Sequence, residues 1–312
     1  MKQIIVAAGI VYGPEGQVLL AQRPPKSHQE GWWEFPGGKL EAGETPHVAL
    51  DRELQEELGI RVLASRPFMT IRHRYEDREV TLLVREVLRY QGEPRGAEGQ
   101  EIAWVKAKDL PQWRVLPADA PVIRALMLPH QYLITPDLEP GDHATLMRGV
   151  HSALARGLPM IQLRLPRWST EDYDAAAKAV MEVTRAAGGQ LLLNRDWRLA
   201  QELGAAGVHL SAAQLNELSE RPAGLSVVAA STHNLEELNR AQALECDFVC
   251  LSPVRRTPTH PEATALNWHG FAELVAESNL PIFALGGVRL EDFDQAREAG
   301  AVGVAGIRGF WL

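Results

Sequence analysis

Three glutamates at helical spacing are the residues of this 312-residue chain best placed to do chemistry. Glu53, Glu56 and Glu57 lie at positions i, i+3 and i+4, so one face of a helix would present all three carboxylates. Like charges at this spacing repel each other, and a hard divalent cation bound through oxygen atoms would offset the repulsion. The spacing alone is more typical of a solvated helix face than of a metal site. The surrounding residues must therefore decide between the two interpretations.

Those surrounding residues supply a loop, a helix start and a helix end. Thr45 can cap the N-terminus, Pro46 suits the first turn, and Gly59 can adopt the left-handed conformation that ends a helix. The run from Gly38 to Ile60 reads Gly-x5-Glu-x7-Arg-Glu-apolar-x-Glu-Glu-x-Gly-apolar. It matches the Nudix box, the signature of the Nudix hydrolases, at every defined position. We therefore favour a metal site over a solvated face.

Residues 1–128 resemble the MutT branch of this family, the 8-oxo-dGTP diphosphatases. The resemblance implies a Nudix α/β/α sandwich with a mixed sheet. It also implies Mg²⁺-dependent hydrolysis of a nucleoside triphosphate, with Mn²⁺ as a substitute metal. The implied metal ligands are the Gly38 carbonyl and the carboxylates of Glu53, Glu56, Glu57 and Glu98. Arg52 would orient a carboxylate, Glu44 would stabilise the junction of loop and helix, and Glu101 is a rival to Glu98.

The resemblance further implies a set of residues around the bound nucleotide. They are Arg23, His28, Phe35, Asp77, Arg78 and Asp119. MutT enzymes carry an asparagine where this chain has Asp119, and an ionised carboxylate can accept a hydrogen bond but cannot donate one. Loss of one such bond would cost about 1–3 kcal/mol. Selectivity for the oxidised base over guanine is therefore a prediction that needs its own test.

The composition narrows the class of protein. A net charge of −8 argues against long nucleic acid as a partner and leaves small nucleotides as ligands. Cys246 and Cys250 lie in one apolar run, so we expect buried thiols and a reducing, cytoplasmic location. No stretch is apolar enough to span a membrane. The first apolar run, residues 4–11, is followed by a turn and a second run, which favours a β-hairpin over a signal peptide.

The hydrophobic pattern changes near Pro129, which would end a helix. We therefore predict two domains, residues 1–128 and 132–312. The first should contain strands at 78–88 and 101–106 and a closing helix at 120–127. In the second, apolar runs alternate with amphipathic helices, as in a TIM-type (β/α)8 barrel. The predicted strands are 132–134, 160–163, 190–193, 207–210, 226–230, 248–251, 282–285 and 303–307. The chain reaches Leu312 soon after the eighth strand, so we expect the last helix to be missing.

The second domain resembles thiamine-phosphate synthase, which holds a pyrimidine diphosphate, magnesium and a thiazole phosphate. Its family motifs fall near the predicted strand ends, where barrel active sites form. The ligand-site residues that the resemblance implies are Gln162, Arg164, Asn194, Ser231, Thr257, Thr259 and Gly287.

Several departures from that family concern charge. They are Pro166 and His260 in place of lysines, Arg195 and Gln214 in place of magnesium ligands, and Arg308 in place of a serine. Loss of acidic metal ligands and of lysines would undermine diphosphate chemistry, so we favour an altered or inactive synthase. Such a barrel could bind a phosphorylated metabolite or serve only as a structural partner.

The leading hypothesis is a Nudix pyrophosphohydrolase that removes 8-oxo-dGTP from the nucleotide pool and so prevents mutation. One alternative is a bifunctional protein with an active thiamine-phosphate synthase. Another is a nucleotide- or thiamine-responsive binding protein with weak hydrolysis. The sequence does not determine the oligomeric state or any coupling between the domains.

Overall fold

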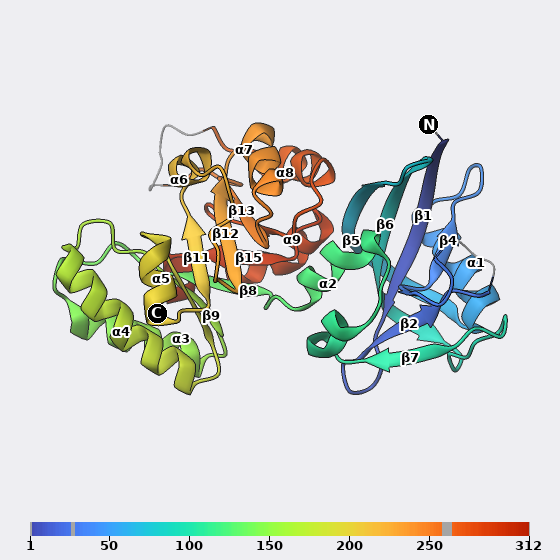
Figure 1. Ribbon diagram of the computed structural model, residues 1–312, viewed down its shortest axis with the longest axis horizontal. Coiled ribbons are helices and arrows are strands. Elements are labelled where there is room, and N and C mark those ends of the chain that lie inside the picture. Colours follow the sequence, from blue (N-terminus) through green and yellow to red (C-terminus); the bar gives the residue numbers. More distant parts are fainter. Residues whose placement is uncertain (1, 26–28, 258–263, 312) are drawn as a thin grey trace. The chain divides into compact units, whose positions relative to one another are not determined.

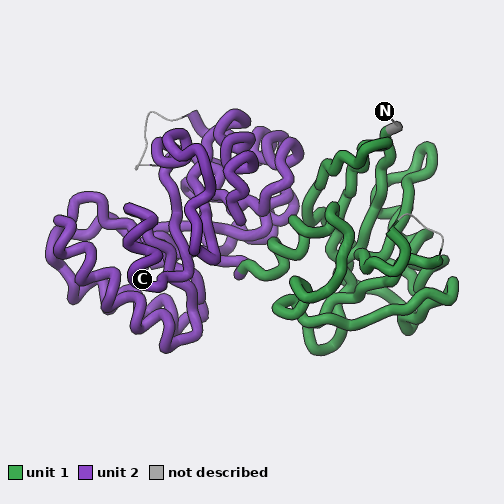
Figure 2. The backbone as a smooth tube through the Cα atoms, viewed as in Figure 1, with its two compact units in different colours: residues 1–128 green, residues 129–312 purple. Residues whose placement is uncertain are grey.

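The chain divides into two compact units, residues 1–128 and 129–312 (Figure 2). The computed structural model describes residues 2–25, 29–257 and 264–311. Each unit encloses a hydrophobic cluster made only of its own residues. No helix within the described ranges is both long and apolar enough to cross a membrane.

The first unit is built on β-strands that form two sheets (Figure 1). The strands are β1 (Lys2–Val11), β2 (Val18–Gln22), β3 (Trp33–Glu34), β4 (Gly37–Lys39), β5 (Arg61–Arg74), β6 (Arg78–Gln91) and β7 (Ile102–Val105). The larger sheet has the order β4-β1-β6-β5, and the smaller one has the order β3-β2-β7. β1 and β6 run parallel, whereas the other pairs are antiparallel. The predicted mixed sheet is therefore confirmed.

The prediction of a hairpin at the start of the chain is correct for the turn and wrong for the pairing of the two strands. Gly13 donates a backbone hydrogen bond to the Gln17 carbonyl at 2.8 Å, and Tyr12 pairs with Val18 in an isolated bridge. Beyond this bridge the two strands enter different sheets. β1 pairs instead with β6 along its whole length, from Lys2 to Val11. Local alternation cannot reveal a partner so distant in the sequence.

The helix of the glutamate run, α1 (Pro46–Leu58), has the predicted ends. The Thr45 side chain accepts the Val48 N–H at 3.4 Å, and Gly59 closes the helix with φ = 71°. The helix packs against β1, β4 and β5. Its buried face consists of Ala49, Leu50, Leu54 and Leu58. The remaining short helices of this unit are η1 (Ala107–Gln112), η2 (Pro117–Asp119) and α2 (Ala120–Leu126).

The second unit is a closed parallel barrel (Figure 1). Within residues 131–257 and 264–311 its strands are β8 (Gln131–Ile134), β9 (Met160–Leu163), β10 (Gln190–Leu193), β11 (Gly207–Leu210), β12 (Val227–Thr232), β13 (Phe248–Leu251), β14 (Ile282–Ala284) and β15 (Gly303–Gly306). They pair in chain order, and β15 closes the barrel against β8. The predicted (β/α)8 architecture is confirmed, with strand bounds close to those expected.

A helix follows each barrel strand. These helices are α3 (His143–Ala155), α4 (Thr170–Ala186), α5 (Trp197–Leu203), α6 (Ala212–Glu217), α7 (Leu235–Ala243), α8 (Asn267–Ala276), α9 (Phe293–Glu298, preceded by η3, Leu290–Asp292) and α10 (Arg308–Trp311). The expectation that the last helix is missing therefore needs correction. α10 is a helix of four residues that packs against α3 and β8, and Phe310 and Trp311 are buried there.

Aromatic rings fill the interior of the barrel. Tyr132, Phe248 and Phe283 come from three different strands and have no exposed surface. Their ring centroids lie between 5.1 and 5.9 Å apart, the spacing at which aromatic rings attract one another. The barrel therefore has a packed core rather than a pore, and a ligand must bind at one end of it.

The contact of α10 with α3 gives a stability prediction. A Cβ at Gly149 in α3 would overlap the Trp311 ring, whereas a Cβ at Gly270 in α8 would meet no atom. We expect Gly149→Ala to lower the free energy of unfolding of the barrel by about 1–3 kcal/mol. The matched control Gly270→Ala should raise it by about 0.5–1 kcal/mol, because alanine favours a helix. Urea denaturation measures both. Equal effects of the two substitutions would contradict this account of α10.

Candidate functional site

Two glycines of β4 bring the backbone against the carboxylates of α1. A Cβ at Gly38 would overlap the Glu53 carboxylate, and a Cβ at Gly37 would overlap the Ala7 carbonyl oxygen. The Gly37 N–H donates to Glu57 Oε2 at 3.1 Å. Only residues without a side chain permit this close approach, so the glycines set the distance between β4 and the glutamates.

Arg52 connects the loop before α1 to the carboxylates on the helix. Its Nε and Nη2 donate to the two Glu44 oxygens at 2.9 and 3.0 Å, and Nη2 also donates to the Lys39 carbonyl at 3.0 Å. Nη1 donates to Glu53 Oε1 at 2.9 Å and lies 3.6 Å from Glu56. Hydrogen bonds from Arg52 lower the pKa of Glu44 to about 2. Arg52 therefore holds loop and helix together through charge-assisted bonds.

Glu57 lies among other carboxylates. Burial, together with the charges of Glu34, Glu53 and Glu98, raises the pKa of Glu57 to about 8, although the Gly37 N–H opposes this shift. The loop that carries Glu98 is fixed to the end of α1. The Ala97 N–H and the Gln100 side chain both donate to the Glu57 carbonyl at 2.8 Å. Glu98 therefore lies within electrostatic reach of Glu57, and Glu101 is not among the groups that shift the Glu57 pKa.

These residues suit a divalent cation by their chemistry. Carboxylate and carbonyl oxygens are the ligands that Mg²⁺ prefers, and a cation here would relieve the repulsion that raises the Glu57 pKa. The Gly38 backbone also lies directly against the Glu53 carboxylate, which any side chain at position 38 would overlap. Across the described ranges, however, no three acidic, histidine or cysteine side chains converge in a metal-binding cluster. Arg52 engages Glu53, so binding of a cation would require the carboxylates to move closer together.

A cavity of about 160 Å³ lies beside β4 and is lined by residues of β1, β3, β4, β6 and η2. Four of the residues predicted to surround a nucleotide line it: Arg23, Phe35, Arg78 and Asp119. Gly37 and Lys39 also line it, so the strand that contacts the glutamates forms part of the cavity wall. The arrangement could hold a base near the carboxylates of α1.

The structure does not bring every predicted residue into the cavity. The side chain of Asp77 is 68% exposed, contacts Arg78 at 2.9 Å and is not part of the lining. His28 lies outside the described residues. Sequence analysis missed Gln29, Glu34 and Tyr75, all of which line the cavity. Only Glu34 carried a local signal, because it directly precedes Phe35 and the two glycines.

Polar groups in this cavity are incompletely paired. Arg23 Nη1 contacts both Glu34 oxygens, at 2.8 and 2.6 Å. Gln29 Oε1 and Asp119 Oδ2 are buried and have no hydrogen-bond partner among the described residues. Burial raises the pKa of Asp119 well above its usual range. Unpaired buried polar atoms are rare in folded proteins, and a ligand is one reason for them.

A second cavity, of about 350 Å³, lies at the carboxyl ends of the barrel strands. Its lining includes the predicted ligand-site residues Gln162, Arg164, Asn194, Ser231 and Thr257. Gln162 Oε1 is buried there without a partner among the described residues. Thr259 lies outside the described residues, as does His260. None of the described residues that line this cavity is acidic.

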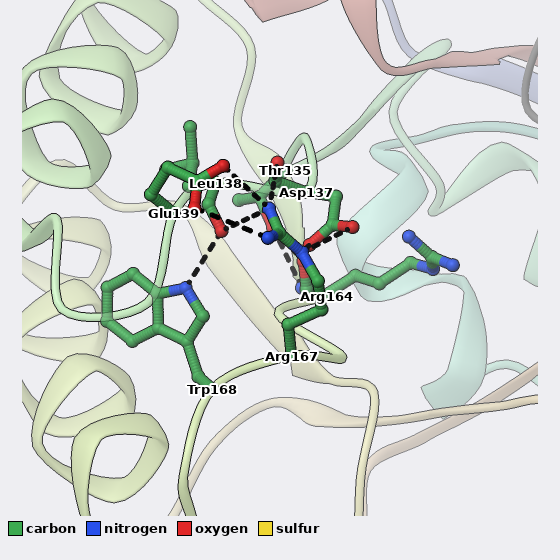
Figure 3. Close-up of polar contacts among 7 residues, drawn as sticks. All are labelled: Thr135, Asp137, Leu138, Glu139, Arg164, Arg167 and Trp168. Carbon is green, nitrogen blue, oxygen red and sulfur yellow. Dashed lines mark hydrogen bonds and ion pairs between the residues drawn. The ribbon is translucent and has the colours of Figure 1, made fainter.

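The loop after β8 holds Arg164 at the rim of this cavity (Figure 3). Thr135 Oγ1 accepts the Arg164 N–H at 2.8 Å and donates to the Arg164 carbonyl at 3.0 Å. Arg167 donates to the carboxylates of Asp137 and Glu139 at 3.0–3.3 Å, and Trp168 Nε1 donates to the Leu138 carbonyl at 3.2 Å. Figure 3 shows these contacts between the loops that follow β8 and β9. Arg167 therefore pairs with two carboxylates of the β8 loop and offsets part of their charge.

Arg195 and Gln214, which stand where the resemblance implies magnesium ligands, are held by contacts within the barrel. Arg195 Nη2 donates to the Trp168 carbonyl at 2.6 Å, and its guanidinium lies 4.5 Å from the Tyr173 ring centroid. Gln214 Nε2 donates to the Arg195 carbonyl at 3.0 Å, and its Oε1 accepts from Ser211. Asp196, the adjacent acid, caps α5. None of Arg195, Asp196 and Gln214 is among the described lining residues of the cavity.

A third cavity, of about 320 Å³, shares Thr257, Leu285, Gly286 and Ile307 with the second. Gly287, which we predicted as a ligand-site residue, lines it. So do three arginines: Arg256, Arg289 and Arg308. Backbone amides near glycines and arginine side chains are groups that bind phosphate. This end of the barrel is therefore suited to an anion.

Comparisons with known proteins agree with both motif resemblances. The NUDIX domain model matches residues 2–126, and the thiamine monophosphate synthase model matches residues 131–310. The 8-oxo-dGTP diphosphatase of Escherichia coli (strain K12) is 39% identical over 126 residues, which are 40% of this chain and 98% of that protein. The CTP pyrophosphohydrolase of the same strain is 38% identical over 127 residues, 41% of this chain and 93% of that protein. The putative thiamine-phosphate synthase 2 of Aquifex aeolicus (strain VF5) is 31% identical over 184 residues, 59% of this chain and 98% of that protein.

The fold and the helix α1, which carries Glu53, Glu56 and Glu57, indicate a hydrolase domain. A synthase-like barrel follows this domain in the chain. The chain belongs to the Nudix family through its first unit and to the thiamine monophosphate synthase family through its second. The first unit is a Nudix hydrolase, an enzyme of a family that generally uses a divalent metal.

The buried His209 of the barrel interior gives a prediction for pH dependence. Ser231 Oγ and the Tyr132 hydroxyl contact the two ring nitrogens of His209 at 2.9 and 3.1 Å, and burial lowers the pKa of His209 from 6.5 to about 3. His209 therefore binds a proton below about pH 6.5 in the unfolded chain, whereas in the folded chain it stays neutral down to about pH 3. Stability should be complete above pH 6.5 and should fall as the pH drops through this window.

The measurement is urea denaturation of the wild type and of His209→Asn at neutral pH and near pH 5. We expect the wild type to lose about 1–2 kcal/mol more than the variant over this interval. Nitrogen NMR of the imidazole ring gives a second test that needs no variant. A ring that is protonated in the folded state near pH 5 would contradict the prediction.

Proposed function

We propose that the first unit hydrolyses 8-oxo-dGTP to 8-oxo-dGMP and pyrophosphate in a Mg²⁺-dependent reaction, for which Mn²⁺ can substitute. The observation that carries this proposal is β4, which lines the cavity of about 160 Å³ with Gly37 and Lys39 and places Gly38 against Glu53. Similarity to relatives named 8-oxo-dGTP diphosphatase supports the choice of substrate. The role would be to sanitise the nucleotide pool and prevent mutation in a cytoplasmic setting.

The proposed roles follow from the contacts around α1. Glu53, Glu56, Glu57 and Glu98, with the Gly38 carbonyl, would hold the metal. When bound, the metal would neutralise phosphate charge and activate a water molecule. Arg52 orients Glu53 through the bond at 2.9 Å, and Glu44 fixes Arg52. Water then splits the linkage between the α- and β-phosphates, which leaves a monophosphate and pyrophosphate.

In the cavity, Phe35 and Asp119 would contact the base. Arg23 and Arg78 would add positive charge beside the nucleotide. His28 remains part of this proposal because the resemblance implies it. Asp77 would act indirectly through its contact with Arg78.

Removal of one charge from the carboxylate helix tests the metal assignment. We expect Glu53→Gln and Glu57→Gln each to lower Mg²⁺-dependent pyrophosphate release by about 100-fold or more, because an amide binds a hard cation poorly. Glu93→Gln, a change of the same kind at an exposed position before Glu98 in the same loop, should retain activity. The measurement is pyrophosphate release from 8-oxo-dGTP, dGTP and CTP. Full activity of either helix variant would refute the metal site, and equal rates for 8-oxo-dGTP and dGTP would refute the sanitising role.

For the second unit we propose binding of a phosphorylated metabolite without catalysis of thiamine-phosphate synthesis. The absence of acidic side chains from the described lining of the barrel cavity carries this proposal, because a diphosphate reaction needs metal ligands there. The cationic lining of the third cavity, with Arg256, Arg289 and Arg308, supports the binding of an anion. A barrel that binds nothing is the alternative, and it would serve only as a structural partner.

A thermal-shift measurement on the full chain tests this proposal. We expect thiamine phosphate at about 100 times its Kd to raise the Tm of the barrel by about 5 °C, equally with Mg²⁺ and with a chelator. Arg164→Gln should reduce the shift, whereas Arg198→Gln, on the exposed side of α5, should not. Formation of thiamine phosphate from the pyrimidine diphosphate and the thiazole phosphate would refute the proposal in favour of a bifunctional enzyme. No shift with any thiamine intermediate would leave the structural role.

A further inference from the structure

Asp119 is an acidic residue at a position where a charge is costly. Its side chain is 3% exposed and lines the cavity of the first unit. The Phe35 backbone N–H donates to its carboxyl, whereas Oδ2 has no partner among the described residues. An ionised carboxylate that keeps one oxygen unpaired in a buried site loses several kcal/mol of hydration. A proton on this carboxyl would remove that cost.

The charged and titratable groups that face Asp119 do not compensate for its burial. They line the same cavity and are Arg23, Glu34, Lys39, Tyr75 and Arg78. The positive charge of Arg23 is shared with Glu34, whose two oxygens lie 2.8 and 2.6 Å from its Nη1. The negative charge of Glu34 acts in the opposite direction to Arg23 on Asp119. Burial outweighs both contributions and raises the pKa of Asp119 well above its usual range.

Protonation changes what Asp119 can offer to a base. An ionised carboxylate only accepts hydrogen bonds, whereas a carboxylic acid accepts one and donates another, as the amide of asparagine does. The edge of 8-oxoguanine carries a donor at N7 and an acceptor at O6. A neutral carboxyl satisfies both, while a carboxylate would leave O6 facing a second acceptor. In guanine N7 is an acceptor, so one of the two contacts is lost and a buried group stays unpaired.

We propose that Asp119 contacts the edge of the bound base as a neutral carboxylic acid and acts there as a combined donor and acceptor. This inference rests on the proposed function, because the base is that of the nucleotide hydrolysed in the first unit. Asp119 is then a specificity-determining residue. As a neutral acid it offers the same hydrogen-bond donor and acceptor as the amide of an asparagine at this position. Deprotonation would remove the donor and weaken binding of 8-oxoguanine.

The first test compares Asp119→Asn with Asp119→Leu in the full chain. At neutral pH we expect the Asn variant to keep kcat/KM for 8-oxo-dGTP within about threefold, because amide and acid offer the same donor and acceptor. The Leu variant, of similar size, should lose about tenfold or more. A loss in the Asn variant as large as in the Leu variant would overturn the proposal, since it would show that the negative charge is required.

Infrared difference spectra provide a readout that does not depend on turnover. The wild type at neutral pH should show a C=O stretching band of a protonated carboxyl that is absent from Asp119→Asn, whereas the contribution of Glu57, whose pKa is also raised, should remain in that variant. Burial also raises the pKa of Glu34, so Glu34→Gln serves as the control that should retain the band. At any pH where the band is lost, kcat/KM of the wild type should fall relative to the Asn variant. At neutral pH, the lack of any band that Asp119→Asn removes, or a band that only Glu34→Gln removes, would overturn the proposal.

The failure of the proposed function is distinguishable from the failure of this inference. Binding of 8-oxo-dGMP, measured by calorimetry without metal, requires no hydrolysis. The same order of the variants in this assay, with no turnover of 8-oxo-dGTP, would refute the proposed reaction and support the role of Asp119. Normal turnover of 8-oxo-dGTP by the wild type, together with weak binding of 8-oxo-dGMP by Asp119→Asn, would support the proposed reaction and refute the role of Asp119.

Discussion

The first unit depends on the close contact between the backbone of β4 and the carboxylates of α1. A Cβ at Gly38 would displace Glu53, and the Gly37 N–H bonds directly to Glu57 at 3.1 Å. Because the same strand forms part of the cavity wall, this contact fixes the distance between the cavity and the carboxylates of α1. Arg52 holds the contact by joining the loop to the helix. Catalysis by orientation needs such rigid spacing more than it needs a reactive side chain.

The two units treat charge in opposite ways. The first gathers carboxylates until burial and mutual repulsion raise the pKa of Glu57 to about 8, an arrangement that favours a cation. The second gathers arginines at one end of the barrel and places no acid among the described residues of its main cavity. A phosphate can be held through a metal ion in the first arrangement and directly by guanidinium groups in the second. The proposed functions, metal-assisted hydrolysis in the first unit and anion binding in the second, follow from this difference in charge.

Much of this molecule could be predicted from local sequence, because the relevant signals act over a few residues. The ends of α1 follow from Thr45, Pro46 and Gly59, and the barrel strands follow from short apolar runs between helical stretches. The separation of β1 from β2 could not be predicted, since the pairing of β1 with β6 depends on distant residues. The contribution of Gln29 and Tyr75 to the cavity was hidden for the same reason.

Charge at a single position is the property that local sequence predicts least well. At Asp119 an apparent exchange of an amide for an anion becomes a near-equivalent substitution once the side chain is buried, because burial favours the neutral acid. Arg195 gives the opposite lesson, since its guanidinium binds the Trp168 carbonyl and lies over the Tyr173 ring, and it is not among the described lining residues of the cavity. At both positions the residue type predicts a charge, but the burial and the contacts of the side chain determine whether that charge acts on a ligand. Two motifs should therefore be compared by the surroundings of each side chain as well as by residue type.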